Sequence, residues 1–352
     1  MLLLNYRPVL RQPTGIGVYA NGVLPALQGL EHSLIPGGGE GGAKERLRRL
    51  AWSQMRLHER ARRAGASLIF TPAPEGYLGR QRIPQVVMVH DLRPISHPER
   101  SLQSLYFRAW VPPLLRSCQR VITNSQFTAS EIERHTGLAA SRISVIPLGY
   151  DDQLFRPASP GSLRQAPPVL AGLEGPYLLH LGQAYPHKNL ERLIRAFAQV
   201  APDHPELKLV LAGKPHGSET PRLQGLVETL GLQDRVRFLA YVPYEQLGDL
   251  YRGALALAYP SLWEGFGLPV LEAMACGTPV LTSVGSGTGE VAGDAALLVN
   301  PTDTGAIAEA LEALAGQPQL RADLVRRGLG RAAGFSWQRT GAATRELLGR
   351  LG

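Results

Sequence analysis

At 352 residues the chain is long enough for two domains of ordinary size. Its composition, 44% hydrophobic and 19% charged, is that of a globular protein, and no run of about 18 apolar residues predicts a transmembrane helix. The opening segment after Met1 is too short for a signal peptide and predicts a buried strand. Two widely spaced cysteines, Cys118 and Cys276, form no metal-binding pattern and favour a reducing, cytoplasmic location.

The net charge of +8 comes from the first part of the chain. Residues 1–150 contain 19 Lys and Arg against 9 Asp and Glu, a net +10, whereas the remainder carries −2. A basic half favours an anionic partner. Nucleic acid is not expected as that partner, because the basic residues are hardly interleaved with aromatic ones and no nucleic-acid-binding module is present.

Short apolar runs of strand type alternate with helical patterns along most of the chain, which predicts an α/β fold with parallel sheets covered on both faces. A segment rich in Pro, Gly, Ala and Ser, residues 155–175, is predicted to link two such units. We therefore expect a first domain over residues 1–160, a second over residues 161–335 and a final helix within residues 336–352. The expected strands are 67–70, 85–89, 120–123, 143–147, 177–181, 208–212, 236–239, 255–259, 279–282 and 296–299.

The first motif in chain order is a glycine-rich turn that contains Gly15 and Gly17 and opens a helical pattern. Taken alone, its Gly-x-Gly-x-x-Ala spacing is compatible with a dinucleotide-binding turn or with a simple tight turn into a helix. Residues 7–14 separate it from the first strand, and no well-placed acidic residue for a ribose follows it. A nicotinamide enzyme built on this turn is therefore kept as one alternative function.

The densest basic run lies between Lys44 and Arg63, and its apolar residues recur near helical spacing. It predicts either an ordinary amphipathic helix packed on a sheet or an interfacial helix attracted to anionic lipid head groups. Under the second interpretation, the protein would make peripheral contact with the inner face of the plasma membrane.

Two further candidates stand where strands end. His90 follows the apolar run 85–89, and ligands of doubly wound sheets bind outside the carboxyl ends of the strands. Asp91 is expected to orient the His90 imidazole through a hydrogen bond. Lys188 follows the strand 177–181 and stands just before a helical pattern, where a cation can stabilise a departing diphosphate.

The most specific pattern surrounds two carboxylates, Glu264 and Glu272. Between them lie a tight glycine loop and the start of a short helix, because Pro269 suits a first helical turn and Gly277 marks a helix end. Backbone N–H groups at such a helix start favour an anion, and carboxylates accept hydrogen bonds from hydroxyls. A sugar nucleotide supplies both a pyrophosphate and hydroxyls. The loop residues in question are Gly265, Phe266, Gly267 and Leu268.

This run resembles the Glu-x7-Glu signature of retaining glycosyltransferases of family 4, which have the GT-B fold: two Rossmann-like doubly wound domains facing across a cleft. The resemblance implies that Glu264 contacts the transferred sugar and Glu272 the ribose. It also implies that Lys188 and the amides of residues 265–268 stabilise the leaving diphosphate. Gln183, at a position where some members have an Arg, is also assigned to donor binding by the resemblance. The resemblance further assigns His90 to the donor sugar, Gly15 and Gly17 to the donor phosphate, and the last helix to the first domain's surface.

The function that we predict is retaining transfer of a hexosyl unit from a nucleoside diphosphate sugar to a hydroxyl of a glycan or lipid-linked acceptor. GDP-mannose is the first choice of donor, because of a similarity to bacterial polysaccharide mannosyltransferases. No cofactor or metal is expected, since no Asp-x-Asp pair is placed as a metal clamp and Asp151-Asp152 reads as a turn. The alternatives are a non-catalytic nucleotide-sugar-binding protein and a glycoside hydrolase that uses Glu264 and Glu272 as its acid pair.

Overall fold

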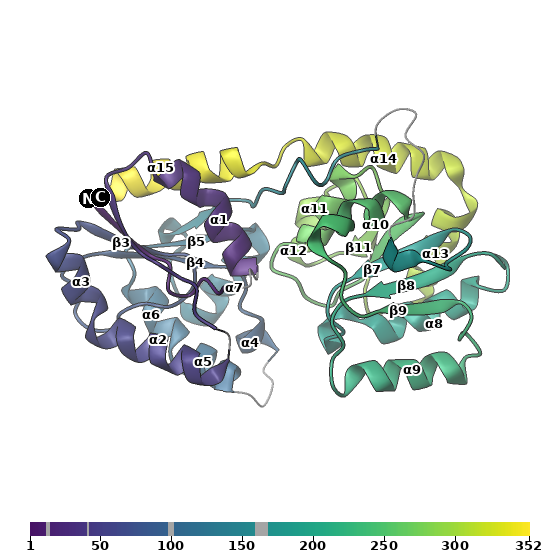
Figure 1. Cartoon of the computed structure of the whole chain (residues 1–352), viewed down its shortest axis with the longest axis horizontal. Helices are drawn as coiled ribbons and strands as arrows, with labels where there is room; N and C mark the ends of the chain where they lie inside the picture. The colour runs from purple at the N-terminus through teal and green to yellow at the C-terminus, as the bar shows by residue number, and fades with distance from the viewer. Residues whose placement is uncertain (12–14, 41, 98–101, 159–167) are drawn as a thin grey trace. The chain divides into compact units, whose positions relative to one another are not determined.

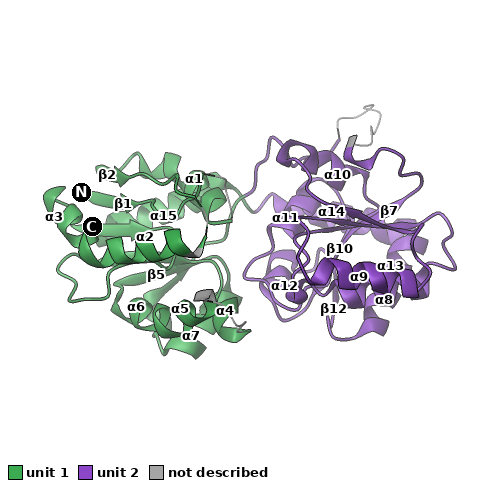
Figure 2. Ribbon diagram, turned by 60° about the horizontal axis from the view of Figure 1, so that its bottom comes forward, with its two compact units in different colours: residues 1–149, 335–352 green, residues 150–334 purple. Residues whose placement is uncertain are grey.

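The computed structural model describes residues 1–11, 15–40, 42–97, 102–158 and 168–352, which form two compact units (Figures 1 and 2). Unit 1 comprises Met1–Gly149 and Phe335–Gly352, and unit 2 comprises Tyr150–Gly334. The boundaries expected after residues 160 and 335 are therefore displaced, the first of them to the peptide that joins Gly149 to Tyr150.

The displacement of the first boundary has a packing reason. Phe155, at the start of the expected linker, is 1% exposed. Its ring makes edge contacts with Tyr244 and Tyr251, at centroid distances of 5.9 and 5.8 Å. A large aromatic side chain buried in this way ties the chain to unit 2. The prediction that a linker begins at residue 155 is therefore wrong, and residues 159–167 of the same segment lie outside the described residues.

Unit 1 is built on a six-stranded parallel sheet with the order β2-β1-β3-β4-β5-β6. Its central strands are fully buried apolar runs, which is the pattern of a parallel sheet covered on both faces. The strands are β1 (Leu2–Asn5), β2 (His32–Ile35), β3 (Leu68–Thr71), β4 (Gln85–Val89), β5 (Arg120–Thr123) and β6 (Ile143–Val145).

Helices cover both faces of this sheet. The last helix of the chain packs beside the first one, α1 (Figure 1), and Trp337 lies so close to Gly22 of α1 that a Cβ there would overlap its indole. The helix expected to return to the first domain is thus part of unit 1. The helices are α1 (Gly15–Leu27), α2 (Ala43–Met55), α3 (Leu57–Arg63), α4 (Arg93–Ser96), α5 (Leu102–Ala109), α6 (Val111–Ser117), α7 (Gln126–Thr136) and α15 (Trp337–Leu351), with a 3₁₀ turn η1 (Ala140–Arg142).

Unit 2 contains a second six-stranded parallel sheet, with the order β12-β11-β10-β7-β8-β9. Read in the chain order of this unit, this is 6-5-4-1-2-3, the doubly wound arrangement of dinucleotide-binding folds. The strands are β7 (Tyr177–Leu181), β8 (Lys208–Ala212), β9 (Val236–Leu239), β10 (Ala256–Tyr259), β11 (Val280–Ser283) and β12 (Leu297–Val299).

An apolar cluster of unit 2 joins α8, α9 and α13 to the sheet through residues such as Phe197, Leu209 and Ile307. These three helices are labelled in Figure 1. A further helix, α14, lies against α11. The helices are α8 (Leu190–Val200), α9 (Glu219–Thr229), α10 (Leu247–Gly253), α11 (Leu268–Ala275), α12 (Gly287–Ala292), α13 (Thr304–Gly316) and α14 (Pro318–Ala332), with 3₁₀ turns η2 (Pro168–Leu170), η3 (Pro186–Lys188) and η4 (Tyr244–Gln246).

Every strand expected from the sequence is present, with bounds that agree or shift by one or two residues. The edge strand β2 was not expected, because its residues are mostly half-buried and it lacks a continuous apolar run. None of the helices in the described part of the chain is long and apolar enough to cross a membrane.

The basic run between Lys44 and Arg63 forms α2 and α3, with a break at Arg56. Some of its apolar residues are buried and others are exposed. Leu50, Leu57 and Ala61 are buried, as an amphipathic helix packed on a sheet requires. Leu47 and Met55, however, are 61% and 69% exposed.

Candidate functional site

The candidate site in unit 2 lies where the strand order reverses. β7 and β10 are neighbours in the sheet, and the chain continues outward from them in opposite directions. Loops that follow two such strands diverge and leave a crevice at the carboxyl edge, which is where open α/β sheets bind ligands. Lys188 follows β7, and Glu264 follows β10.

Lys188 and Glu264 form an ion pair across these two loops. The Lys188 Nζ atom donates to Glu264 Oε1 and to the Tyr259 hydroxyl, at 2.6 Å each. The two charged side chains are 14% and 15% exposed, so a ligand at the carboxyl edge can still reach them. Two residues predicted from separate motifs are thus brought into direct contact.

The surroundings keep Lys188 charged. Burial alone would lower its pKa, but the Glu264 carboxylate and the Tyr259 hydroxyl hold the pKa of Lys188 above its ordinary value. Tyr259 also stacks on the buried His180 ring, with centroids 5.1 Å apart. Burial lowers the pKa of His180 to about 3, so this imidazole is neutral beside the lysine and adds no competing positive charge.

The glycine loop after Glu264 leads into α11 as the sequence predicts. The helix begins at Leu268, Pro269 lies in its first turn, and Gly277 follows its end with φ 73°. Gly267 is the N-cap, with φ 105°, and a Cβ there would come within 2.5 Å of the Thr288 side chain. Only glycine satisfies both conditions, and the turn directs the N-terminus of α11 to the carboxyl edge, where its dipole favours an anion.

The segment at the start of α12 supports the glycine loop that follows Glu264. The Gly287 amide donates to the Glu264 carbonyl at 2.9 Å, and a Cβ on Gly287 would collide with the Gly265 carbonyl. The Ser286 and Thr288 hydroxyls bond each other at 2.8 Å beneath the loop. The glycines in this segment therefore allow a close approach of two backbones, which fixes the loop that carries Glu264.

Glu272 lies on α11 and has a different environment. Its Oε2 atom accepts a hydrogen bond from the Tyr251 hydroxyl at 2.8 Å. Burial raises the pKa of Glu272 to about 7, an effect that the Tyr251 hydroxyl opposes and the nearby Asp151 carboxylate reinforces. Asp151 itself forms the expected turn, because its side chain accepts from the amides of Gln153 and Leu154.

The remaining predicted residues are divided between the two units. Gln183 follows β7 and its amide reaches the Pro215 carbonyl at 3.5 Å, which is a weak contact. In unit 1, Gly15 is the first residue of α1 and Gly17 lies in the first turn of that helix. The three residues before Gly15 lie outside the described part of the chain.

His90 meets the same helix. Its ring makes an edge contact with Tyr19 of α1, at 5.2 Å between centroids, and its Nε2 atom lies 3.2 Å from the Pro72 carbonyl. Since a carbonyl only accepts, Nε2 carries the proton. Burial lowers the pKa of His90 to about 4. Unit 1 thus brings together the start of α1, with Gly15 and Gly17, and a neutral histidine.

Within the described ranges, no group of three or more His, Cys, Asp or Glu side chains could hold a metal ion.

Comparison with known proteins gives this geometry a context. A family model described as "Glycosyltransferase Family 4" matches residues 17–154, and one described as "Glycosyl transferases group 1" matches residues 165–331. The O-antigen chain mannosyltransferase B of Escherichia coli is 34% identical over 274 residues, which are 75% of this chain and 70% of that protein. The chain belongs to glycosyltransferase family 4.

Other relatives are similar over shorter stretches. D-inositol 3-phosphate glycosyltransferase 2 of Catenulispora acidiphila is 36% identical over 66% of this chain and 56% of its own length. The O-antigen chain mannosyltransferase RfbU of Salmonella typhimurium is 34% identical over 62% of this chain and 57% of its own length. The aligned part thus spans little more than half of these two relatives.

Solved structures confirm the GT-B fold of this family 4 chain. Sucrose-phosphate synthase from Thermosynechococcus elongatus has a TM-score of 0.80 at 22% identity, with 99% of this chain and 98% of that chain covered. Anabaena HepE in complex with UDP-glucose has a TM-score of 0.79 at 21% identity, with 99% and 100% covered.

Three side chains that contact the predicted site had no role in the sequence-based prediction: Tyr259, Tyr251 and Asn189. The hydrogen bonds that tie them to the site join residues 71, 21 and 71 positions apart in the sequence. Tyr259 ends the expected strand 255–259 and Asn189 directly follows Lys188, but residue type alone gave them no function.

Proposed function

We propose that this protein is a retaining glycosyltransferase that moves a hexosyl group from a nucleoside diphosphate sugar to a hydroxyl of a glycan or lipid-linked acceptor. The observation that supports it most is the Lys188–Glu264 pair at the carboxyl ends of β7 and β10, beside the N-terminus of α11. A cation and a helix N-terminus suit a diphosphate, and the carboxylates suit sugar hydroxyls.

In this mechanism, the bond between the anomeric carbon and the diphosphate oxygen breaks while the acceptor oxygen bonds the same carbon on the same face. The acceptor proton passes to the departing phosphate. Lys188 and the α11 amides stabilise the negative charge that develops on the diphosphate. Glu264 holds the transferred sugar, Glu272 holds the ribose, and the neutral His90 contacts the sugar without repelling its developing positive charge. No metal is required, because the protein cation and the helix dipole meet the diphosphate.

The donor that we propose is GDP-mannose. Two relatives bear the name of O-antigen chain mannosyltransferases, which also favours an acceptor in polysaccharide synthesis. HepE was crystallised with UDP-glucose, so UDP-glucose is the second donor to test.

Thermal unfolding with a nucleotide panel tests the donor class. A ligand at about 100 times its dissociation constant adds about 2.7 kcal/mol to the free energy of unfolding, which should raise Tm by about 4 °C for a chain of this length. We expect this shift with GDP and GDP-mannose, and none with NAD as the control. No shift with any nucleotide or nucleotide sugar, or a shift with NAD alone, would contradict the proposal. Turnover then separates an enzyme from a binding protein, and the anomeric coupling of the product tests retention.

Peripheral contact with an anionic membrane is a second part of this proposal, and α2 and α3 carry it. The exposed Leu47 and Met55 stand next to Arg48 and Arg56 in the sequence. Both arginines are also exposed, and they pair with Glu45 and Glu59. Apolar side chains among cations favour insertion at a negatively charged lipid surface. This contact would bring the enzyme to a lipid-linked acceptor.

Sedimentation with vesicles tests that contact. We expect the protein to bind vesicles rich in anionic phospholipid and to remain free of vesicles made only of phosphatidylcholine. The double substitution Leu47→Asp and Met55→Asp should weaken binding at least about 10-fold, because it removes two apolar side chains and adds two negative charges. Leu298→Asp, at a 39% exposed leucine of unit 2, is the matched control. Equal losses in the two proteins would refute the assignment to α2.

A further inference from the structure

Asn189 has a left-handed backbone conformation. It is the only non-glycine residue with a positive φ, 61°, in the described part of the chain. It occupies the N-cap of α8, directly after Lys188, and is 4% exposed. A side chain held in the left-handed region costs free energy and persists where its surroundings fix it. The residue next to the proposed catalytic lysine is therefore held by specific contacts.

Those contacts are not the ones that an N-cap asparagine usually makes. An N-cap side chain normally accepts a hydrogen bond from an amide in the first turn of its helix, and Asn189 makes no such bond. Its Nδ2 atom instead donates to the Pro260 carbonyl at 2.9 Å and to the Pro301 carbonyl at 2.6 Å. One amide group thus joins the loop after β7 to the loops after β10 and β12.

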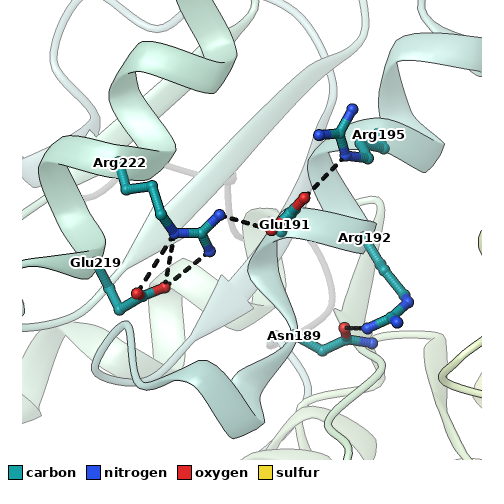
Figure 3. A network of polar contacts seen from close by, with 6 residues as sticks. All are labelled: Asn189, Glu191, Arg192, Arg195, Glu219 and Arg222. Carbon is teal, nitrogen blue, oxygen red and sulfur yellow. Dashed lines mark hydrogen bonds and ion pairs between the residues drawn. The ribbon is translucent and has the colours of Figure 1, made fainter.

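The orientation of this amide is fixed from the helix side. Arg192, one turn along α8, donates to Asn189 Oδ1 at 3.0 Å (Figure 3). With Oδ1 occupied by Arg192, Nδ2 faces the two carbonyls. Figure 3 also shows Glu191 bound to Arg222 of α9, so the first turn of α8 is fastened to its neighbour as well.

The bond to Pro260 has a direct consequence for the ion pair. Pro260 directly follows β10 and lies on the loop that carries Glu264. The Leu262 amide donates to the His187 carbonyl at 2.8 Å, which adds a backbone bond between the same two loops. The residues on both sides of Lys188 therefore bind the Glu264 loop.

We propose that Asn189 is a positioning residue for donor binding: its side chain holds the Lys188 loop in register with the Glu264 loop, so that the lysine ammonium faces the donor diphosphate. This rests on the proposed function. Asn189 does not touch the donor, and it acts through the position of Lys188.

Two substitutions separate the side chain from the backbone. Asn189→Gly keeps the positive φ without strain and removes all three side-chain hydrogen bonds. Asn189→Asp keeps the shape and the acceptor for Arg192 but removes both donated bonds. GDP and UDP are titrated separately by calorimetry. For the nucleotide that the wild type binds, we expect each variant to raise the Kd about 10-fold.

A double-mutant comparison tests the route through Lys188. In a Lys188→Ala background, the Asn189 substitutions should change Kd by less than about 2-fold, since there is no ammonium left to position. Arg235→Gln is the matched structural control, because Arg235 donates to the carbonyls of Ala201, His204 and Leu207 at the opposite, amino edge of the same sheet. It should lower Tm and leave Kd unchanged.

The other outcomes distinguish a failure of the positioning role from a failure of the proposed function. A Kd like that of the wild type in both Asn189 variants, or the same loss with and without Lys188, would overturn the positioning role and leave the proposed function standing. A Lys188→Ala protein with unchanged affinity would overturn the proposed function itself, and the positioning role with it.

Discussion

Replacing Lys188 with alanine should lower kcat/KM for the nucleotide sugar by about 100- to 1,000-fold, which is the usual loss when one preorganised charge donor is removed from an active site. The ammonium group of Lys188 lies at the carboxyl edge of the sheet, and Glu264 and Tyr259 hold it at 2.6 Å. Its raised pKa keeps the ammonium group charged at neutral pH. The effect should appear in donor affinity and in turnover, because the diphosphate is bound first and then leaves.

The measurement needs a control for the carboxylate that loses its partner. Lys188→Ala leaves Glu264 uncompensated in a partly buried position, which is itself destabilising. The double variant Lys188→Ala with Glu264→Gln removes that charge. If its Tm recovers while its affinity for GDP or UDP does not, the loss of affinity belongs to the lysine, because a free nucleoside diphosphate lacks the sugar that Glu264 holds. Lys208→Ala serves as the matched surface control, because Lys208 bonds the Asp234 carbonyl at the amino edge. Activity within about 3-fold of the wild type in Lys188→Ala would contradict the role.

Donor affinity should rise about 10-fold between pH 6 and pH 8, because Glu272 has a pKa of about 7 and a change of one pH unit on either side of a pKa takes a group from about 10% to about 90% ionised. Only the ionised carboxylate accepts hydrogen bonds from both ribose hydroxyls. His90, with a pKa of about 4, does not titrate in this interval. A nucleotide sugar is the right probe, since its diphosphate is esterified at both ends and keeps a constant charge.

The free energy of unfolding should decrease as pH rises, whereas donor affinity increases. Burial raises the pKa of Glu272 above its ordinary value of 4.5, so the folded state binds this proton more tightly than the unfolded state does. Its contribution to stability is therefore greatest below about pH 4.5 and is lost as pH rises to about 7. Glu272→Gln should flatten both profiles, and Tyr251→Phe should move the midpoint upward by removing a bond to the carboxylate. An affinity that rises equally in Glu272→Gln would refute the assignment.

The fold was largely predictable because its signals are local. Parallel strands buried on both faces appear as continuous apolar runs, and each such run that was identified is a strand. The strand β2 was not predicted, because an edge strand buries little and its burial pattern lacks a continuous run. The burial of Phe155 was not predicted for the converse reason. It stands in a segment whose composition is that of a linker, and its burial depends on Tyr244 and Tyr251, almost one hundred residues away.

The candidate site was predictable only in part. Glu264 and Lys188 lie on loops that follow strands, and Glu272 lies on the short helix after the glycine loop. These positions can be predicted from the spacing of the motifs. Their partners could not be predicted in this way. Tyr251 reaches Glu272 from another helix, and Asn189 reaches the Pro301 carbonyl across 112 positions. Such contacts follow from the order of the strands in the sheet, which is a property of the whole unit rather than of any segment.

A crystal structure of the full chain with GDP or UDP bound, whichever stabilises it, would show where the donor diphosphate lies. We expect the diphosphate within hydrogen-bonding distance of Lys188 and of the amides at the start of α11, and the ribose hydroxyls on Glu272. A nucleotide bound away from these residues, with the Lys188–Glu264 pair untouched, would contradict this expectation.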